Sequence, residues 1–148
     1  MVQRQTSAIP DLLLVEDEPA EIYLLEKAFA SGPLPVHVHV ATTGETALAF
    51  LRREGSYHQA PRPQLIITSL NLPGMGGLAL VAALKRDQAF ARIPVIVLTH
   101  YSLPEMITQS YALGANCYLV KPQELDALFA LVHAMEEFWL KTATLSSL

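Results

Sequence analysis

Residues 11–19 read DLLLVEDEP, a short apolar run that ends at three consecutive acids and a proline. An apolar run of this length, closed by polar residues, is typical of a buried β-strand. Pro19 suits the first turn of a helix, where its missing N–H would have no partner, and apolar residues then recur at helical spacing as far as Phe29. The stretch therefore predicts a buried strand that passes through an acidic turn into a helix.

The same pattern recurs along the chain. Further buried strands are predicted at residues 65–67, 94–98 and 117–120, and valines that alternate with His37 and His39 predict an edge strand at 36–40. Helical spacing follows each strand, and the last helix is expected to begin near Gln123 and to reach about Leu140. Five strands that alternate with five helices predict an α/β fold, a doubly wound parallel sheet with helices on both faces.

Length and composition limit the function classes. The 148 residues, 51% of them hydrophobic, suit one domain, expected at 11–140 between tails at 1–10 and 141–148. A net charge of -4 without a basic run argues against nucleic acid as a partner. No apolar stretch approaches the ~20 residues of a membrane helix, and Cys117 is the one cysteine. We expect a cytoplasmic protein without membrane contact.

Polar side chains follow four of the predicted strands. Glu16 and Asp17 come after the first strand, Ser69 after the third, Thr99 after the fourth and Lys121 after the fifth. In doubly wound sheets, ligands bind beyond the carboxyl ends of the strands, near the point where the strand order reverses. We therefore expect these two acids, two hydroxyls and one amine to converge at one edge of the sheet.

The segments that carry these residues are LLLVEDEP, LIITSLNLPGMGG, PVIVLTH and GANCYLVKP. In order and spacing they resemble the signature segments of response-regulator receiver domains. The loop GSYHQAPRP and the FWL near the end resemble, more narrowly, the small stand-alone regulators that accompany phytochrome histidine kinases. The resemblance implies a flavodoxin-like fold with strand order 2-1-3-4-5, phosphorelay signal transduction through protein contacts, no enzymatic activity, and a histidine kinase of the phytochrome kind as partner.

The resemblance also implies roles for single residues. Glu16 and Asp17 would hold Mg²⁺, with the backbone carbonyl of Asn71 as a further ligand, because Mg²⁺ prefers oxygen ligands and keeps several waters. Three residues would contact the phosphoryl group or follow it as a switch: Thr99, Tyr118 and Lys121. The family's Lys-Pro peptide, here Lys121–Pro122, is usually cis.

Ser69 departs from the family, because it occupies the position of the phosphate-accepting aspartate. A neutral hydroxyl without a neighbouring base is a poor nucleophile and cannot form an acyl phosphate. Loss of this carboxylate should weaken the Mg²⁺ site, and Lys121 should turn to Asp17 or Glu16. We expect phosphotransfer to be lost. Either the chain is a phosphorylation-independent receiver with a closed pocket, or it is the inactive form of an ordinary phosphoacceptor.

A second function class shares the predicted fold, namely flavodoxin-like cofactor-binding proteins. The acidic turn at Glu16 would repel a flavin phosphate, and the surroundings of Ser69 lack the glycines of a hydrolase nucleophile elbow. A solvated edge strand explains His37 and His39 more simply than a shared metal ion does. Two roles remain open for His100, next to Thr99: a contact with the pocket, or a surface-lining role, which is favoured.

The last predicted helix carries more large apolar side chains than one buried face accommodates. Phe138, Trp139 and Leu140 follow an inward stripe that already contains Phe129, Val132 and Met135. An apolar patch left outside the core is typical of a subunit contact. We therefore predict a homodimer that uses Phe138, Trp139 and Leu140.

Overall fold

The computed structural model describes residues 8–147, in which strands and helices alternate. The strands are β1 (Asp11–Val15), β2 (His37–Ala41), β3 (Leu65–Thr68), β4 (Val95–Thr99) and β5 (Cys117–Val120). The α-helices are α1 (Pro19–Ala30), α2 (Gly44–Arg52), α3 (Gly76–Arg86), α4 (Pro104–Ala112) and α5 (Leu125–Glu137). A short 3₁₀ helix, η1 (Gly55–Tyr57), follows α2, and a π-helix, η2 (Phe138–Thr142), continues α5.

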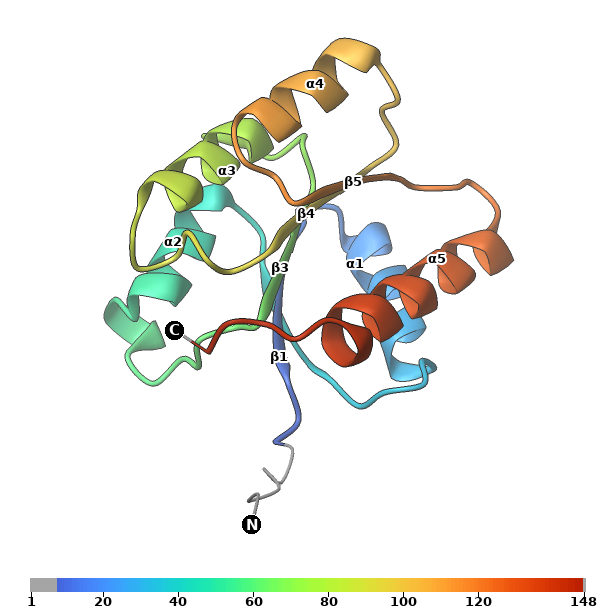
Figure 1. Cartoon of the computed structure of the whole chain (residues 1–148), viewed down its shortest axis with the longest axis horizontal. Helices are drawn as coiled ribbons and strands as arrows, with labels where there is room; N and C mark the ends of the chain where they lie inside the picture. The colour runs from blue at the N-terminus through green and yellow to red at the C-terminus, as the bar shows by residue number, and fades with distance from the viewer. Residues whose placement is uncertain (1–7, 148) are drawn as a thin grey trace.

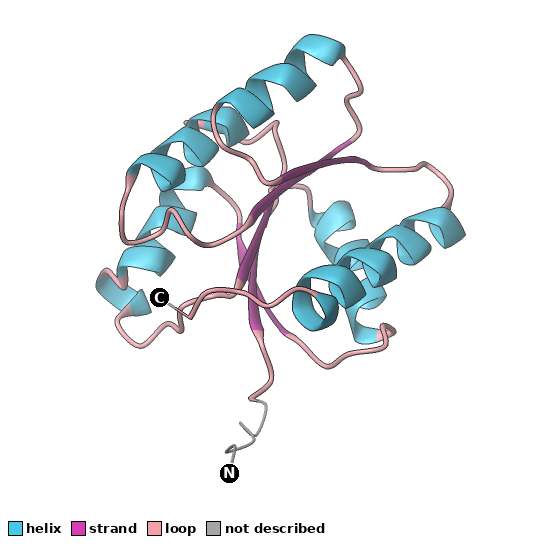
Figure 2. Cartoon of the chain, viewed as in Figure 1, coloured by secondary structure: helices cyan, strands magenta, loops and turns pink. Residues whose placement is uncertain are grey.

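The five strands form one parallel sheet in the order β2-β1-β3-β4-β5. Helices α1 and α5 cover one face of the sheet, and α2, α3 and α4 cover the other (Figures 1 and 2). The predicted flavodoxin-like fold is therefore confirmed. The strand with the alternating valines and histidines, β2, lies at the edge of the sheet as predicted.

The core consists of two apolar layers, because successive side chains of a strand point to opposite faces of the sheet. Leu12 and Leu14 of β1 pack toward α1 and α5, whereas Leu13 and Val15 pack toward α2 and α3. β3 and β4 are buried along their whole length, as central strands covered on both faces should be. None of the helices among residues 8–147 is long and apolar enough to cross a membrane.

The turn after β3 depends on a close approach of two backbone segments. A Cβ added to Gly77, in the first turn of α3, would overlap the carbonyl oxygen of Ser69 and the Cα of Leu70. The amide of Gly77 donates to the carbonyl of Leu70 at 2.9 Å. The start of α3 lies so close to the backbone of Ser69 and Leu70 that only glycine, which has no Cβ, fits at position 77.

The chain after α5 differs from the predicted single helix to Leu140, since α5 ends at Glu137 and the wider turn of η2 follows. Phe138 is 52% exposed, but Trp139 and Leu140 pack partly against the core layer of α1 and α5. The subunit contact through Phe138, Trp139 and Leu140 therefore remains a prediction, in which Phe138 offers the most exposed side chain. The domain limits at 11 and 140 remain a prediction, and most of the predicted N-terminal tail lies outside the described residues.

Candidate functional site

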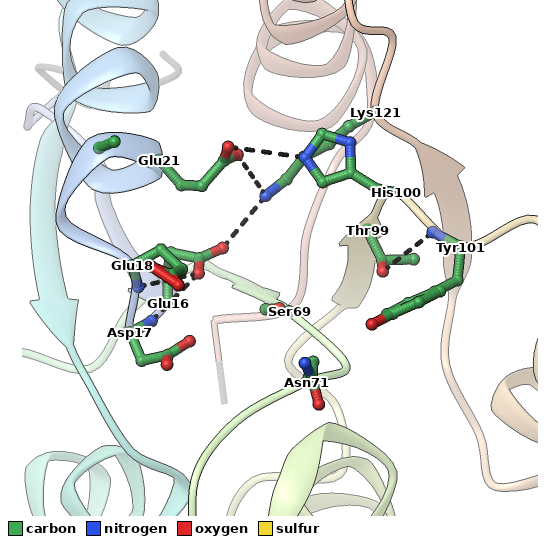
Figure 3. A pocket seen from close by; sticks show the side chains of 11 residues that line it. Glu16, Asp17, Glu18, Glu21, Ser69, Asn71, Thr99, His100, Tyr101 and Lys121 are labelled. Atoms are coloured by element: carbon green, nitrogen blue, oxygen red, sulfur yellow. Dashed lines mark hydrogen bonds and ion pairs between the residues drawn. The ribbon is translucent and has the colours of Figure 1, made fainter.

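The carboxyl ends of β1, β3, β4 and β5 surround a pocket of about 380 Å³ (Figure 3). It brings together all the polar residues that follow the predicted strands: Glu16, Asp17, Ser69, Thr99 and Lys121. Asn71, the predicted carbonyl ligand, lines the same pocket. The pocket therefore lies where parallel α/β sheets bind their ligands.

Glu16 is the buried acid of the turn after β1, with 3% of its surface exposed. Its Oε2 accepts hydrogen bonds from the backbone amides of Asp17 at 3.1 Å and Glu18 at 3.2 Å, just before α1 begins. These bonds fix the carboxylate beneath the N-terminus of α1, where a negative charge is also favoured by the helix dipole. Asp17 is half-buried, and its side chain makes no hydrogen bond or ion pair with the described residues.

Lys121 crosses the pocket from the end of β5 and is only 5% exposed. Its Nζ donates to Oε1 of Glu16 at 3.1 Å and to Oε1 of Glu21 at 2.8 Å. The predicted turn toward Glu16 is confirmed, whereas no such contact joins Lys121 to Asp17 among the described residues. Two carboxylates compensate this buried ammonium group, which would be costly to leave unpaired. The bond between Lys121 and Pro122 is trans rather than cis, the isomer that an X–Pro bond favours without other constraints.

Glu21 is the functional candidate that the sequence analysis missed. It lies in the first turn of α1, directly after the acidic turn of Glu16 and Asp17, and a further acid at this place was the available signal. Burial alone would raise the pKa of Glu21, but the hydrogen bond and charge of Lys121, then those of His100, outweigh it and lower that pKa. His100 Nε2 lies 3.5 Å from Oε2 of Glu21. His100 thus lies at the surface, as expected, and also lines the pocket, where the carboxylate of Glu21 is within its reach.

Thr99 and Tyr118, the predicted switch residues, both contact the backbone of Tyr101. The amide of Tyr101 donates to Oγ1 of Thr99 at 3.3 Å, and its carbonyl accepts a hydrogen bond from the Tyr118 hydroxyl at 2.8 Å. Thr99 is 3% exposed, and burial raises the pKa of the Tyr118 hydroxyl. The loop between β4 and α4 is thus joined to the pocket on one side and to β5 on the other.

Ser69 lies at the floor of the pocket and is 9% exposed. Its amide donates to the carbonyl of Val15 at 3.0 Å, and its carbonyl accepts from the Thr68 hydroxyl at 2.9 Å. The first of these bonds holds the backbone of Ser69 against β1, and the residue lines the pocket. A residue at this position is well placed to meet a ligand, but serine brings no charge to it.

The donor set for a divalent cation is small. One oxygen of Glu16 is bonded to Lys121 and the other to backbone amides. Among the described residues that line the pocket, this leaves Asp17 and the exposed Glu18 as the carboxylates without such partners. Within residues 8–147, no three histidine, cysteine, aspartate or glutamate side chains are placed to share a metal ion. His39, the other metal candidate, instead lies 2.9 Å from the carboxylate of Asp11, while His37 is exposed at the sheet edge.

Comparisons with known proteins agree with this geometry. The model of the response regulator receiver domain matches residues 12–133. Response regulator Rcp1 of Synechocystis sp. is 39% identical over 134 residues, which cover 90% of this chain and 91% of Rcp1. The crystal structure of the phosphorylated cyanobacterial phytochrome response regulator RcpA is 44% identical, with a TM-score of 0.90, and the match covers 95% of this chain and all of RcpA. The Mn²⁺-bound form of Rcp1 gives a TM-score of 0.87 at 38% identity, over 93% of this chain and 99% of Rcp1.

Proposed function

Because the chain belongs to the response regulator receiver domain family, we propose that it is a stand-alone two-component receiver that phosphorylation at residue 69 does not switch. It is related to the phytochrome response regulators Rcp1 and RcpA. The chain matches nearly the whole length of Rcp1 and of RcpA. This supports a regulator that acts through protein contacts rather than through an enzymatic reaction of its own. No observation favours a flavodoxin-like cofactor binder over this function.

The observation that carries the proposal is the identity of the buried residue at the end of β3. Ser69 shares its pocket with Thr99 and Lys121, but Lys121 is already bonded to Glu16 and Glu21. Transfer of a phosphoryl group to Ser69 would require a base to take the hydroxyl proton. Ser69 makes no side-chain hydrogen bond to a carboxylate or histidine among the described residues, so no group is placed to do this.

We place a weakened Mg²⁺ site in the same pocket. Asp17 and the carbonyl of Asn71 would bind the ion directly and Glu16 through water, with the remaining positions filled by solvent. The proposal is supported by the Mn²⁺-bound form of Rcp1, a relative that binds a divalent cation. In this chain Lys121 competes for Glu16 at 3.1 Å, and Ser69 supplies no carboxylate, so the affinity should be lower than in a receiver with an aspartate there.

The partner that fits this family is a histidine kinase, and the relation to RcpA and Rcp1 favours one of the phytochrome kind. We further propose a homodimer in which Phe138, the exposed member of the predicted contact, lies at the interface. Direct binding to nucleic acid is not expected for a chain of net charge -4, and the cytoplasm remains the predicted location.

Labelling with radioactive acetyl phosphate in the presence of Mg²⁺ tests the proposal. The chain as it stands should take up no label, whereas the Ser69→Asp variant should form an acid-stable, base-labile acyl phosphate. Binding of beryllofluoride, followed by fluorine NMR, provides a second readout with the same expectation. Label on the unsubstituted chain that disappears in a Ser69→Ala control would refute the proposal.

A further inference from the structure

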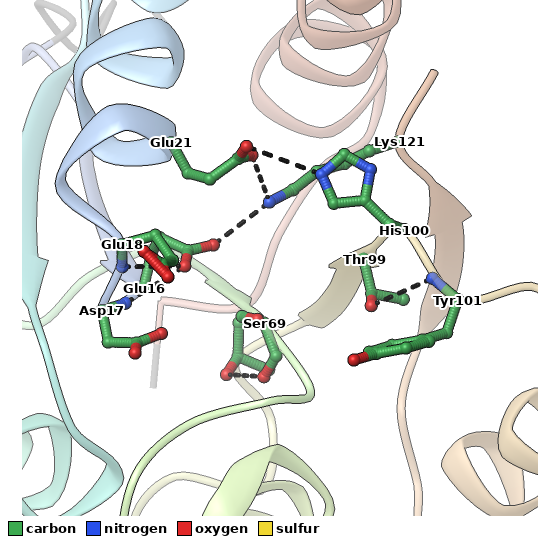
Figure 4. Close-up of polar contacts among 10 residues, drawn as sticks. Glu16, Asp17, Glu18, Glu21, Ser69, Thr99, His100, Tyr101 and Lys121 are labelled. Atoms are coloured by element: carbon green, nitrogen blue, oxygen red, sulfur yellow. Dashed lines mark hydrogen bonds and ion pairs between the residues drawn. The ribbon is translucent and has the colours of Figure 1, made fainter. Parts of the chain in front are cut away.

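The side chain of Glu21 contacts residues that follow two different strands across the mouth of the pocket (Figure 4). It lies in the first turn of α1, and its carboxylate reaches Lys121 at the end of β5 and His100 at the end of β4, at 2.8 Å and 3.5 Å. The two contacts use different oxygens, so both can form together. Glu21 therefore links the start of α1 to the ends of β4 and β5, which are themselves joined by the backbone bond from the amide of Lys121 to the carbonyl of Thr99.

The contact to Lys121 is the stronger of the two. The side chain of Lys121 is 3% exposed and that of Glu21 26% exposed, so water screens this pair little. The side chain of His100 is 50% exposed, and exposed pairs are worth little on their own. The position of Glu21 is thus set by Lys121, and the weaker contact to His100 forms with a carboxylate that is already ordered, so that it restrains His100 with little further loss of side-chain entropy.

The position of His100 matters because the next residue connects the two switch side chains. The backbone of Tyr101 donates to Thr99 and accepts from Tyr118. A restraint on His100 therefore limits how far the peptide of Tyr101 can move. Through that peptide the restraint reaches the loop before α4 and the side chain of Tyr118.

We infer that Glu21 is a positioning residue that takes the place of a carboxylate at position 69 as the counter-ion of Lys121 and, through His100, fixes the loop between β4 and α4. The inference rests on the proposed function, in which Ser69 contributes no charge and receives no phosphoryl group. In a receiver that takes up no phosphoryl group, the contacts of Glu21 with Lys121 and His100 would thereby keep the pocket and this loop in one conformation.

The test is nuclear magnetic resonance of the full chain and of Glu21→Gln, a variant that keeps the shape of the side chain and removes its charge. The amide signals of His100 and Tyr101 and the ring signals of Tyr118 should shift, while those of β2 at the far edge should not. The matched control is Glu18→Gln, which removes a charge from the same pocket wall without breaking any ion pair among the described residues. It should leave the three signals in place.

A second arm separates a positioning role from a local change of structure. In the Ser69→Asp background the new carboxylate competes for Lys121, so Glu21→Gln should perturb His100, Tyr101 and Tyr118 much less than it does in the unsubstituted chain. Equal perturbation in both backgrounds, or no perturbation in either, overturns the inference. No phosphoryl donor is present, so this result does not depend on whether the chain can be labelled, and failure of the labelling test would be recognised separately.

Discussion

Lys121 and Glu21 are 100 positions apart in the sequence, yet their side chains lie 2.8 Å apart at the carboxyl edge of the sheet. Glu16, on the other side of the ammonium group, completes the pairing. The pocket therefore has its own counter-charges for the lysine that, in relatives of this family, is expected to meet a phosphoryl oxygen. The ammonium group of Lys121 is therefore neutralised by carboxylates of the protein, and the site needs no added anion such as a phosphoryl group.

The Glu21 pair should make stability depend on pH in the acid range. Burial raises the pKa of Glu21, but Lys121 and His100 lower it further, to a net value below the ordinary carboxyl value. The pair therefore stabilises the fold above the unfolded-state pKa of this group, and that contribution is lost as the pH falls through the lower folded-state pKa. In urea unfolding at neutral pH, the free energy of unfolding of Glu21→Gln should be lower than that of the unsubstituted chain by about 1 kcal/mol.

At a pH below both pKa values, the difference between Glu21→Gln and the unsubstituted chain should shrink, because both side chains are then neutral. Glu18→Gln, at an exposed position without an ion pair to the described residues, is the control and should show little difference at either pH. A destabilisation by Glu21→Gln that stays constant across the acid range would contradict this account.

A second carboxyl group should act in the opposite direction. Glu136 in α5 is fully buried, and neither of its oxygens has a hydrogen-bond partner among the described residues. Burial raises the pKa of Glu136, and neither the backbone of Leu34 nor the charge of His133 offsets this. A raised pKa means that stability is fully present below the unfolded-state value and is lost as the pH rises through the folded-state value.

Glu136→Gln should therefore become more stable than the unsubstituted chain as the pH rises, by about 1–3 kcal/mol once the carboxylate is ionised. Chemical unfolding across the neutral and alkaline range, followed by the fluorescence of Trp139, measures the difference. The neighbouring Glu137→Gln is exposed and should show no such trend. If Glu136→Gln were less stable at every pH, an unseen partner of the carboxylate would have to be sought.

Gly77 should be intolerant of a side chain, because a Cβ there would overlap the backbone of Ser69 and Leu70. Overpacking of this kind lowers the free energy of unfolding by about 1–3 kcal/mol. The atoms that the new Cβ would meet belong to the backbone, which cannot move aside as a flexible side chain could. We expect Gly77→Ala to lower the denaturation midpoint and to shift the amide signal of Ser69. Ala79→Ser, at an exposed position of the same helix, should do neither.

Phe138 should determine whether the chain dimerises, because Trp139 and Leu140 are partly covered by the domain itself. Sedimentation at micromolar concentration should show a dimer for the unsubstituted chain and a monomer for Phe138→Glu. Tyr23→Glu is the control, since it places the same charge at an exposed aromatic position on α1. A monomer for the unsubstituted chain would remove the dimer from the proposal.

Much of the fold follows from local pattern. The apolar run Leu12–Val15 and its counterparts near Ile66 and Val97 required buried strands, and the helical spacing between them required crossovers. The edge position of β2 followed from its alternation of valine with His37 and His39. The change from α-helix to π-helix after Glu137 did not follow, because the apolar spacing continues through it and the helix itself goes on to Thr142.

By itself, the sequence determined the sheet, the family, and the set of polar residues at the strand ends, because each of these depends on short-range order or on spacing along the chain. The tertiary structure alone decided which of these residues are partners. Lys121 pairs with Glu16 and Glu21 rather than with Asp17, and His100 lies beside Glu21 at the pocket. An ion pair forms over a few ångströms between side chains that are far apart in the sequence, here by 100 positions for Lys121 and Glu21, so only the packing of the elements decides which charges meet.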